Sequence, residues 1–473
     1  MTADKATQRY RLEWALLPGG WARDVVASVS DAGLLTEVRV EDGGADALPV
    51  GGYVIPGMPN AHSHAFQRAL AGRTEFRGRS RDSFWTWRQA MYRLANRVDA
   101  PGLRIIATQL FIEMLKAGYT SVAEFHYLHR TGSADPAAGD TSSFDPRLWD
   151  AVLDAARDVG IGLTFLPTLY QYADFGAAPL RPEQRRFQLR TEEFLEAVGQ
   201  RVAAERHSGH PGMRIGAAFH SLRAVPLDVL REASTQLRHL DAAMPIHIHV
   251  AEQILEVRGC VGATGTRPIE LLLNSAVLNE HWCLVHCTHA SPIELTRIAA
   301  TGAAVCVSIS TEANLGDGFF DAPRFWGAGG RLCIGSDSQS TVDPAEELRW
   351  LEYQQRLRRR RRVILADEGE PHAGTNLWRT AALAGARALG QPIGQIAVGS
   401  RADWLVLDPQ HPTLAGATPE SALDHVLFAG ARAAIRDCCV AGRWVIKQGA
   451  HPREQLASAQ FGDLMRRLAD SAS

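Results

Sequence analysis

The stretch "YVIPGMPNAHSH", residues 53–64, joins an apolar run to two histidines one residue apart. Its first half is rich in the β-branched and apolar side chains that are typical of buried parallel strands. Residues i and i+2 of a strand point the same way, so His62 and His64 can both face one end of it. The stretch therefore predicts a buried strand that ends in two imidazoles able to share a cation.

Seven similar runs follow it along the chain. They are "TSVAEFHYLH", "GLTFLPTLY", "MRIGAAFHSLR", "IHIHVAEQ", "CLVHCTHA", "AAVCVSIS" and "RLCIGSDSQ". The intervening segments have helical periodicity; "LRIIATQLFIEMLKAG", residues 103–118, also ends in a glycine suited to a helix C-cap. Eight alternating strands and helices over residues 53–339 predict an α/β protein with a (β/α)8 TIM-like barrel.

The two ends of the chain lack this alternation. They carry short strands and turns such as "RADWLVLDP" and "IRDCCVAGRWVIKQG". We expect both ends to meet in one small β-sandwich beside the barrel. The predicted boundaries are 1–55 for its N-terminal part, 56–390 for a metal-dependent barrel, and 391–473 for its C-terminal part and a C-terminal tail.

Composition limits the possible partners. The 473 residues are 46% hydrophobic and 22% charged, with a net charge of -2, so neither nucleic acid nor an anionic membrane is an expected partner. The chain has no run of 18 apolar residues and no apolar signal segment at its start. Its seven cysteines form no CxxC pair and lie mostly in apolar runs, which favours reduced thiols and a cytoplasmic protein. The basic run "RLRRRRR", residues 356–362, reads as a solvated helix end, and its role stays open.

Ionisable side chains gather where the predicted strands end. The catalytic groups of such barrels lie at the C-terminal ends of the strands, and buried ionisable groups are costly unless they are paired or bound to metal. Candidates follow the first, fourth, fifth, sixth and eighth strands: His62 and His64, His220 and Arg223, His249 and Glu252, His286, and Asp337.

Several of these histidines have alternatives. His247 lies two residues before His249 on the same strand and could compete with it as a ligand. We rank His247 as a barrel-core residue because Glu252 follows His249 by three and places an acid beside the site. Asp337 alone could simply cap a turn. Three further histidines near strand ends are not assigned as ligands: His126 and His129, which stay open, and His289, expected in a loop.

A set of three imidazoles and one carboxylate suits a borderline divalent ion. Zinc fits best, with iron and manganese as alternatives. No strand end offers a lysine, which a carbamylated side chain bridging two metals would require. The sequence therefore favours a mononuclear site.

The motifs resemble a known family. HxH after the first strand, HxxE at residues 249–252, a histidine after the sixth strand and an aspartate after the eighth resemble the mononuclear deaminase branch of the amidohydrolase superfamily. The resemblance covers essentially the whole chain. Within that branch, "PGMPNAHSHAFQRALAGRTE", "HVAEQ", "LVHCTHA", "STEANLGDG" and "GSDSQ" are similar to the N-formimidoyl-glutamate deiminases of histidine degradation.

The resemblance implies a role for each matching residue. It implies metal ligation by His62, His64, His249 and Asp337, and substrate contacts by Gln67, Arg88, Tyr127, His220 and Arg223. It further implies catalytic roles for three residues. Glu252 moves protons at the substrate nitrogen, His286 polarises the metal-bound water or steadies the tetrahedral adduct, and Asp337 takes the proton of the attacking water. The expected reaction converts N-formimidoyl-L-glutamate to N-formyl-L-glutamate and ammonia, in a homodimer.

The residue chemistry agrees with a substrate that has two carboxylates. Arginine forks suit carboxylates, and Arg88 and Arg223 could hold such a tail. One alternative is another aminohydrolase of this branch that acts on a purine, pyrimidine or triazine ring, but a ring calls for aromatic stacking and few cations. A non-catalytic metal-binding scaffold is a second alternative; it would be expected to have lost a ligand or Glu252, and all are present.

Overall fold

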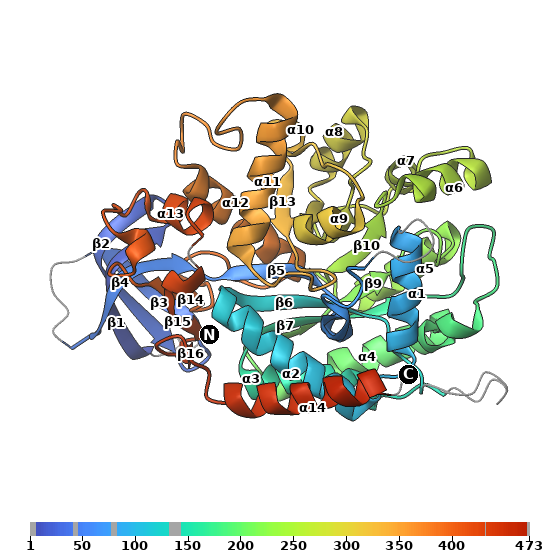
Figure 1. The fold of residues 1–473 in the computed structure, drawn as a ribbon, viewed down its shortest axis with the longest axis horizontal. Helices are drawn as coiled ribbons and strands as arrows, with labels where there is room; N and C mark the ends of the chain where they lie inside the picture. Colours follow the sequence, from blue (N-terminus) through green and yellow to red (C-terminus); the bar gives the residue numbers. More distant parts are fainter. Residues whose placement is uncertain (1–5, 41–45, 77–82, 132–142, 431, 471–473) are drawn as a thin grey trace.

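Two β-sheets lie next to each other in the computed structural model (Figure 1). The structure describes residues 6–40, 46–76, 83–131, 143–430 and 432–470. One sheet is a nearly closed parallel barrel, and the other is a mixed sheet built from strands near both ends of the chain. The predicted fold class, a (β/α)8 barrel with a small β-sandwich domain formed from both termini, is confirmed: the barrel is present, and the second unit drawn from both ends of the chain is a mixed sheet.

The barrel contains the eight predicted strands in chain order, each parallel to its neighbours. A parallel bridge between Ser63 and Asp337 joins the ends of the first and last strands, and the Asp337 backbone N–H donates to the His62 carbonyl at 3.0 Å. The strands are β5 (Met58–Ser63), β6 (Tyr119–His126), β7 (Gly162–Leu169), β9 (Ala217–Phe219), β10 (Ile246–Val250), β11 (Trp282–His286), β12 (Ala304–Val307) and β13 (Arg331–Ile334).

The fourth strand is interrupted. Its first part, β8 (Met213–Ile215), pairs only with β7, while β9 continues the barrel. Gly216 separates the two parts, and a Cβ there would lie 2.7 Å from the Pro245 carbonyl oxygen. The close approach of the neighbouring chain therefore requires a glycine, which breaks a strand that the apolar run predicts as continuous.

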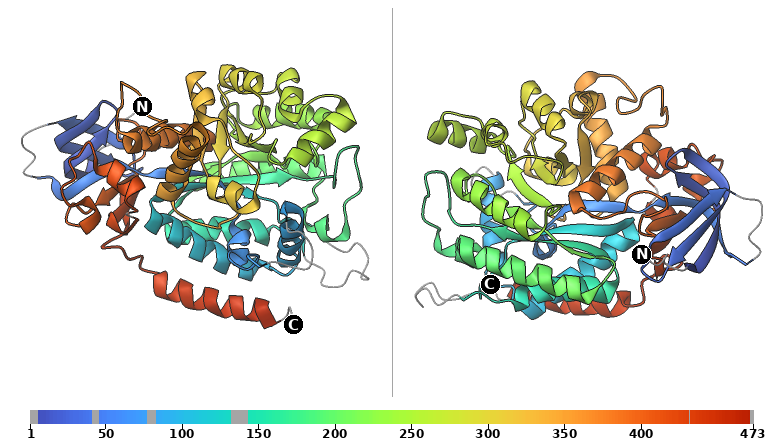
Figure 2. Two further views of the ribbon diagram at one scale, coloured as in Figure 1. Left: turned by 45° about the horizontal axis from the view of Figure 1, so that its top comes forward. Right: turned by 180° about the vertical axis from the view of Figure 1, so that it is seen from behind.

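Helices cover the outside of the barrel (Figures 1 and 2). Helix α2 ends at Gly118, the predicted C-cap, which adopts a left-handed φ of 108°. The helices are α1 (Phe84–Ala95), α2 (Ala100–Ala117), α3 (Arg147–Val159), α4 (Thr191–Ser208), α5 (Leu227–Leu240), α6 (Ile254–Thr264), α7 (Pro268–Asn274), α8 (Pro292–Thr301), α9 (Ile309–Leu315), α10 (Ala322–Gly327), α11 (Pro344–Arg359), α12 (Ala373–Leu389), α13 (Ala422–Phe428) and α14 (Glu454–Asp470), with short 3-10 helices η1 (Ala65–Leu70), η2 (Pro182–Phe187), η3 (Pro412–Leu414) and η4 (Arg432–Ala434).

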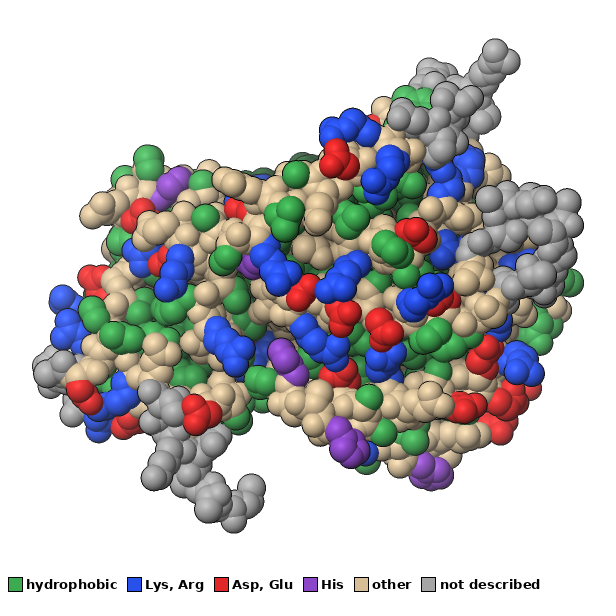
Figure 3. All heavy atoms as spheres, turned by 90° about the horizontal axis from the view of Figure 1, so that it is seen from below, with side chains coloured by type: hydrophobic (Ala, Val, Ile, Leu, Met, Phe, Trp, Pro, Cys, Tyr) green, Lys and Arg blue, Asp and Glu red, His purple; other side chains and the backbone are tan. Residues whose placement is uncertain are grey.

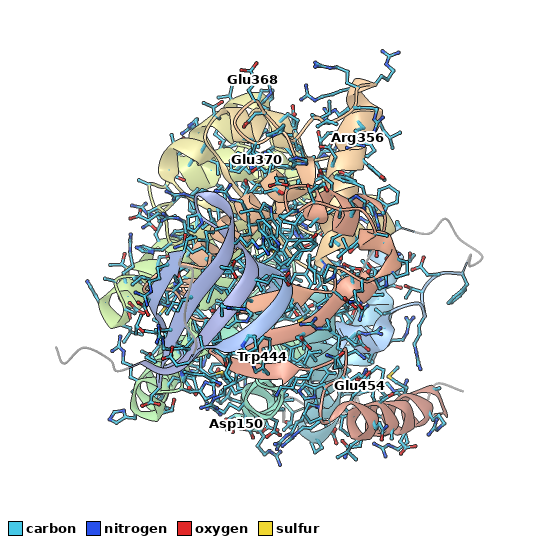
Figure 4. All side chains as sticks on the ribbon, turned by 90° about the vertical axis from the view of Figure 1, so that its left-hand side faces the viewer. Asp150, Arg356, Glu368, Glu370, Trp444 and Glu454 are labelled. Carbon is cyan, nitrogen blue, oxygen red and sulfur yellow. The ribbon has the colours of Figure 1, made fainter. Side chains whose placement is uncertain are left out.

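The accessory unit is a single seven-stranded mixed sheet in the order β16-β15-β14-β4-β1-β2-β3. Trp444, labelled in Figure 4, packs edge-on against the buried Trp404 with ring centroids 6.3 Å apart. The chain passes from this sheet to the barrel at Gly57, where a Cβ would lie 2.2 Å from Thr120. The strands are β1 (Ala6–Leu17), β2 (Gly20–Ser30), β3 (Leu35–Val40), β4 (Leu48–Pro56), β14 (Trp404–Leu407), β15 (Ile435–Val440) and β16 (Arg443–Ile446).

The surface carries charges of both signs. On the face seen in Figure 3, basic and acidic side chains are interspersed. The basic run begins as the last turn of α11, where Arg356, labelled in Figure 4, contacts Glu352 at 2.7 Å, and Arg359 contacts Asp321 at 2.7 Å. This part of the run is a charge-paired helix end, as its position after an acidic start suggests. Within the described part of the chain, no helix combines the length and apolarity that crossing a bilayer requires.

Three buried histidines away from the strand-end cluster make stability depend on pH. Burial lowers the pKa of His126 to about 3 and that of His247 to about 4, and holds the pKa of His129 well below its ordinary value of 6.5. Below pH 6.5 the unfolded chain therefore binds more protons at these histidines than the folded protein does. Their contribution to stability is complete above that pH and is lost as the pH falls toward the folded-state pKa values, by on the order of 1 kcal/mol per histidine at pH 5.5.

We expect His247→Gln, which retains a donor for the Ala388 carbonyl, to reduce this dependence. The shift in the urea unfolding midpoint between pH 7.5 and pH 5.5 should be smaller than in the unmodified protein. His239→Gln is the matched control because His239 is exposed on α5. An equal pH shift in the unmodified protein and both variants would show that His247 is not neutral when buried.

Candidate active site

The backbone at three strand ends adopts a conformation that side-chain-bearing residues rarely use. Ala251, His286 and Asp337 have φ values of 53°, 73° and 46°, in the left-handed region. Ala251 directly follows β10, His286 is the last residue of β11, and Asp337 lies three residues after the end of β13. Such strain persists only where the surrounding structure fixes it, and it concentrates at functional sites.

Four of the predicted residues converge on one point. His62, His64, His249 and Asp337 are buried, and each offers a ligand atom within 4.8 Å of the other three. The His249 and His62 Nε2 atoms are 3.0 Å apart, and Asp337 Oδ1 lies 3.3 Å from the Nε2 atoms of both His62 and His64. These side chains come from the end of β5 and the residue after it, from β10, and from the turn after β13, so barrel closure brings them together.

Hydrogen bonds fix the orientation of two of these imidazoles. His64 Nδ1 lies 2.8 Å from the Phe125 carbonyl oxygen, and His249 Nδ1 lies 2.9 Å from that of His220. A carbonyl only accepts, so each Nδ1 must carry the proton and donate it. Each Nε2 then presents a lone pair to another member of the cluster, Asp337 for His64 and His62 for His249, which is the arrangement usual for metal-binding histidines.

The geometry fits a metal ion. Two ligands about 2.0–2.2 Å from one zinc ion lie about 3–3.5 Å from each other. The contacts of 3.0 and 3.3 Å within the cluster match this spacing. Burial alone would raise the pKa of Asp337, but its close contacts with the His62 and His64 imidazoles hold that pKa well below its ordinary value, so Asp337 is a carboxylate. The cluster is a buried His-His-His-Asp metal site.

Two further predicted residues lie beside the cluster. His286 Nε2 is 3.8 Å from both Glu252 Oε1 and Asp337 Oδ2. Burial raises the pKa of Glu252 to about 7, and the positive charge of His286 opposes this rise. Burial alone would lower the pKa of His286, but the surrounding carboxylates, with Glu252 first, outweigh it and raise the pKa to about 10. A proton can therefore be held at either group near neutral pH.

Three buried glutamates support these residues and were not found from the sequence. Glu312 Oε1 lies 3.2 Å from His286 Nδ1, which directs the other ring nitrogen toward Glu252. Glu256 accepts the backbone N–H of Glu252 at 3.1 Å. Glu124 accepts the Ser63 hydroxyl between the two histidines of the HxH motif, at 2.7 Å. Glu312 does lie in the quoted motif "STEANLGDG", but no spacing rule connects it to His286.

The cluster opens into a cavity of about 560 Å³, mouth included. Among the described residues, no carboxylate lies within 4.0 Å of the cavity arginines Arg88 and Arg223, although the charges of Glu256 and Glu252 act on Arg223 from further away, and Arg223 Nε has no hydrogen-bond partner. The like charge of Arg223 adds to burial in lowering the pKa of Arg88. An anionic ligand would relieve this repulsion. All five predicted substrate-contacting residues line the cavity: Gln67, Arg88, Tyr127, His220 and Arg223.

The remaining candidate histidines lie outside the cluster. His247 Nε2 donates to the Ala388 carbonyl at 2.8 Å, as expected of a core residue. His126 and His129, left open from the sequence, contact the carbonyls of Leu128 and Thr168 at 2.7 and 2.8 Å. His289 follows β11 in a loop and does not belong to the four-residue cluster.

Comparisons with known proteins agree with this site. Residues 53–445 match the amidohydrolase family. A formimidoylglutamate deiminase from Pseudomonas aeruginosa is 47% identical over 462 residues, which are 97% of this chain and 99% of that protein. A solved amidohydrolase from Brucella melitensis superimposes with a TM-score of 0.89 at 38% identity, covering 98% of this chain and 100% of that one.

A more distant structure shows the same fold. It is an adenosine deaminase from Xanthomonas campestris with bound zinc, which is 20% identical and superimposes with a TM-score of 0.80, covering 98% of this chain and 99% of that one. The family match spans most of the chain and includes every residue of the metal site. The chain therefore belongs to the amidohydrolase family.

Proposed function

We propose that this protein hydrolyses N-formimidoyl-L-glutamate to N-formyl-L-glutamate and ammonia. One observation carries the proposal: two arginines, with no carboxylate of the described residues within 4.0 Å, face the same cavity as the His-His-His-Asp cluster. A substrate with a reactive cationic group at one end and carboxylates at the other matches this distribution of charge. The relative from Pseudomonas aeruginosa, whose name states this activity, matches nearly the full chain.

His62, His64, His249 and Asp337 would hold one divalent ion, for which we propose zinc. Three imidazoles and a carboxylate suit zinc, and the buried cluster has the spacing that its ligands require. When bound, such an ion supplies Lewis acidity and lowers the pKa of a water molecule toward neutrality. The carbonyl partners of His64 and His249 keep their Nε2 lone pairs available for this ligation.

The proton transfers are assigned to two carboxylates. Water adds to the formimidoyl carbon, and Asp337 accepts the proton that the water loses. The bond from this carbon to its terminal nitrogen then breaks, and Glu252 delivers the proton with which that nitrogen leaves as ammonia. As the C=O bond of the product forms, the adduct hydroxyl returns its remaining proton to the Glu252 carboxylate. The raised pKa of Glu252 suits a group that must give up a proton near neutral pH.

The remaining site residues stabilise or bind charged groups of the substrate and of the adduct. His286, with Glu312 behind it, carries a positive charge 3.8 Å from Asp337 and steadies the negative charge that develops on the adduct. Arg88 and Arg223 hold the carboxylates, with Gln67, Tyr127 and His220 around them. Because the carboxylates do not react, their binding energy serves to place the carbon against the attacking water.

We also propose that the protein is a cytoplasmic homodimer. The dimer rests on the family resemblance. The cytoplasmic location rests on the buried free cysteines, which suit a reducing compartment.

A substrate panel tests the proposed reaction. We expect ammonia release from N-formimidoyl-L-glutamate with a kcat/KM at least about 10³-fold above that for guanine, cytosine or adenosine, because two fixed arginines would be left unpaired by an uncharged ring. Faster release from any of the rings would favour the alternative of a ring aminohydrolase. An absence of turnover on the whole panel by metal-loaded protein would favour a scaffold.

A further inference from the structure

One end of the cavity contains a pair of tyrosines that the proposed reaction does not yet use. Tyr92 lies on α1, one helical turn after Arg88, and Tyr170 directly follows β7. Both are buried and line the cavity together with Arg88 and Arg223. The charges of both arginines interact with both phenol groups, and the Arg88 guanidinium lies 5.5 Å from the centre of the Tyr92 ring.

A buried glutamine determines how these hydroxyls can hydrogen-bond. Gln184 Nε2 donates to the Tyr170 hydroxyl at 2.8 Å and to the Tyr92 hydroxyl at 3.1 Å. The orientation of its amide is fixed because Gln184 Oε1 accepts the Arg181 backbone N–H at 3.1 Å. Each hydroxyl therefore receives a hydrogen bond from Gln184 and must direct its own proton elsewhere.

The described residues leave at least one of these protons free. The two hydroxyls also interact with each other, so one O–H can donate to the other hydroxyl. The second O–H then has no acceptor among the described side chains, although it is buried beside a cavity. A buried donor without a partner is costly, so this geometry calls for an acceptor from the ligand.

We propose that Tyr92 and Tyr170 complete a carboxylate receptor with Arg88 and Arg223, and that Gln184 directs their hydroxyl protons toward the bound carboxylate. The proposal rests on the proposed function for the identity of the substrate, N-formimidoyl-L-glutamate. Tyr92 and Tyr170 are binding residues, whereas Gln184 acts through them and is a positioning residue. Together they favour a dianionic substrate over one with a single carboxylate.

The double variant Tyr92→Phe/Tyr170→Phe tests the hydroxyls. We expect KM for N-formimidoyl-L-glutamate to rise about 10- to 100-fold, as for the loss of hydrogen bonds to a charged group, with kcat changed less than about threefold. Tyr172→Phe, in the same loop but outside the described lining, should leave KM unchanged. An unchanged KM in the double variant overturns the proposal.

Two substrate analogues with a single carboxylate each test whether the tyrosine hydroxyls bind a carboxylate or only maintain the shape of the cavity. N-formimidoyl-4-aminobutyrate lacks the α-carboxylate, and N-formimidoyl-2-aminobutyrate lacks the side-chain carboxylate. The loss of kcat/KM in the double variant should disappear on whichever analogue lacks the carboxylate that the hydroxyls bind. Equal losses on both analogues would show that the tyrosines merely shape the cavity, and would also overturn the proposal.

Gln184→Glu tests the positioning role because it keeps the size of the side chain but replaces its donor by an acceptor. The hydroxyls would then donate to the new carboxylate, so KM should rise at least about 10-fold, whereas Gln188→Glu, which adds the same charge at the end of η2, should not raise it. In the double phenylalanine background, Gln184→Glu should have a smaller effect, since its partners are gone. Equal effects in both backgrounds would exclude action through the hydroxyls.

Equilibrium binding of glutarate distinguishes failure of this inference from failure of the proposed function. Glutarate has two carboxylates and no reactive carbon, and calorimetry on the metal-loaded protein reports its binding without turnover. Tighter binding to the unmodified protein than to the double phenylalanine variant, by about 10-fold or more, supports the receptor even if N-formimidoyl-L-glutamate is not hydrolysed. Equal binding to both proteins overturns the receptor even if hydrolysis is observed.

Discussion

Replacing Glu252 by glutamine is expected to lower kcat for ammonia release by about 10²- to 10⁴-fold. A carboxamide keeps the shape of the side chain but cannot deliver a proton to the departing nitrogen. KM should change little, because Glu252 lies 3.8 Å from His286 and belongs to the proton-transfer group rather than to the cationic end of the cavity. Steady-state kinetics at saturating N-formimidoyl-L-glutamate measure the loss.

Two controls keep this result specific. Metal content should stay at one ion per chain, because Glu252 is not among the four clustered ligands. Glu368→Gln should have normal activity, because Glu368 is exposed on the surface, as Figure 4 shows. If Glu252→Gln keeps more than a tenth of the activity, a different group moves the proton.

Removal of the metal is expected to abolish activity, to below about 1% of the initial rate, since the chain's own side chains cannot supply Lewis acidity. Dialysis against a chelator followed by readdition of zinc, manganese or iron(II) should restore turnover. The ion that restores it at the lowest free concentration identifies the preferred metal. Activity that survives chelation with no metal left in the protein would contradict the assigned site.

The histidine pair on β10 provides a matched comparison for the metal site. His249→Gln should lower the affinity of the protein for the metal at least about tenfold, because the Nε2 atom of His249 lies 3.0 Å from that of His62 within the cluster. His247→Gln, two residues earlier on the same strand, should retain a full equivalent, because His247 binds a backbone carbonyl instead. Elemental analysis after gel filtration measures both. Similar losses in the two variants would mean that folding, rather than ligation, is affected.

The barrel and much of the candidate site could be predicted because they depend on short-range sequence patterns. Buried parallel strands require apolar runs, and their carboxyl ends must meet at one face of the barrel, so the ionisable residues at the strand ends could be grouped without coordinates. The family resemblance then implied His62, His64, His249 and Asp337 as the ligands among them. The preference for His249 over His247 used the same logic, since an acid three residues on places chemistry beside it. The structure brings the first four residues together and leaves His247 outside.

The parts that could not be predicted depend on contacts between distant segments. Glu312 on α9 contacts His286 at the end of β11, and Gln184 contacts Tyr92 across 92 residues of sequence. The periodicity of the sequence does not indicate which residues form such long-range pairs. The break at Gly216 likewise arises from the close approach of Pro245, and neither this approach nor the left-handed backbone at Asp337 can be read from composition.

The bridge between Ser63 and Asp337 closes the barrel at the same place where its ligands assemble. The first and last strands of the barrel therefore meet here. A bound ion would cross-link them, because its ligands come from the ends of both strands. A nascent chain that has not yet emerged past residue 337 has all three imidazoles but no fourth donor. Capture of the ion through all four donors is therefore deferred until the last barrel strand has been synthesised and docked.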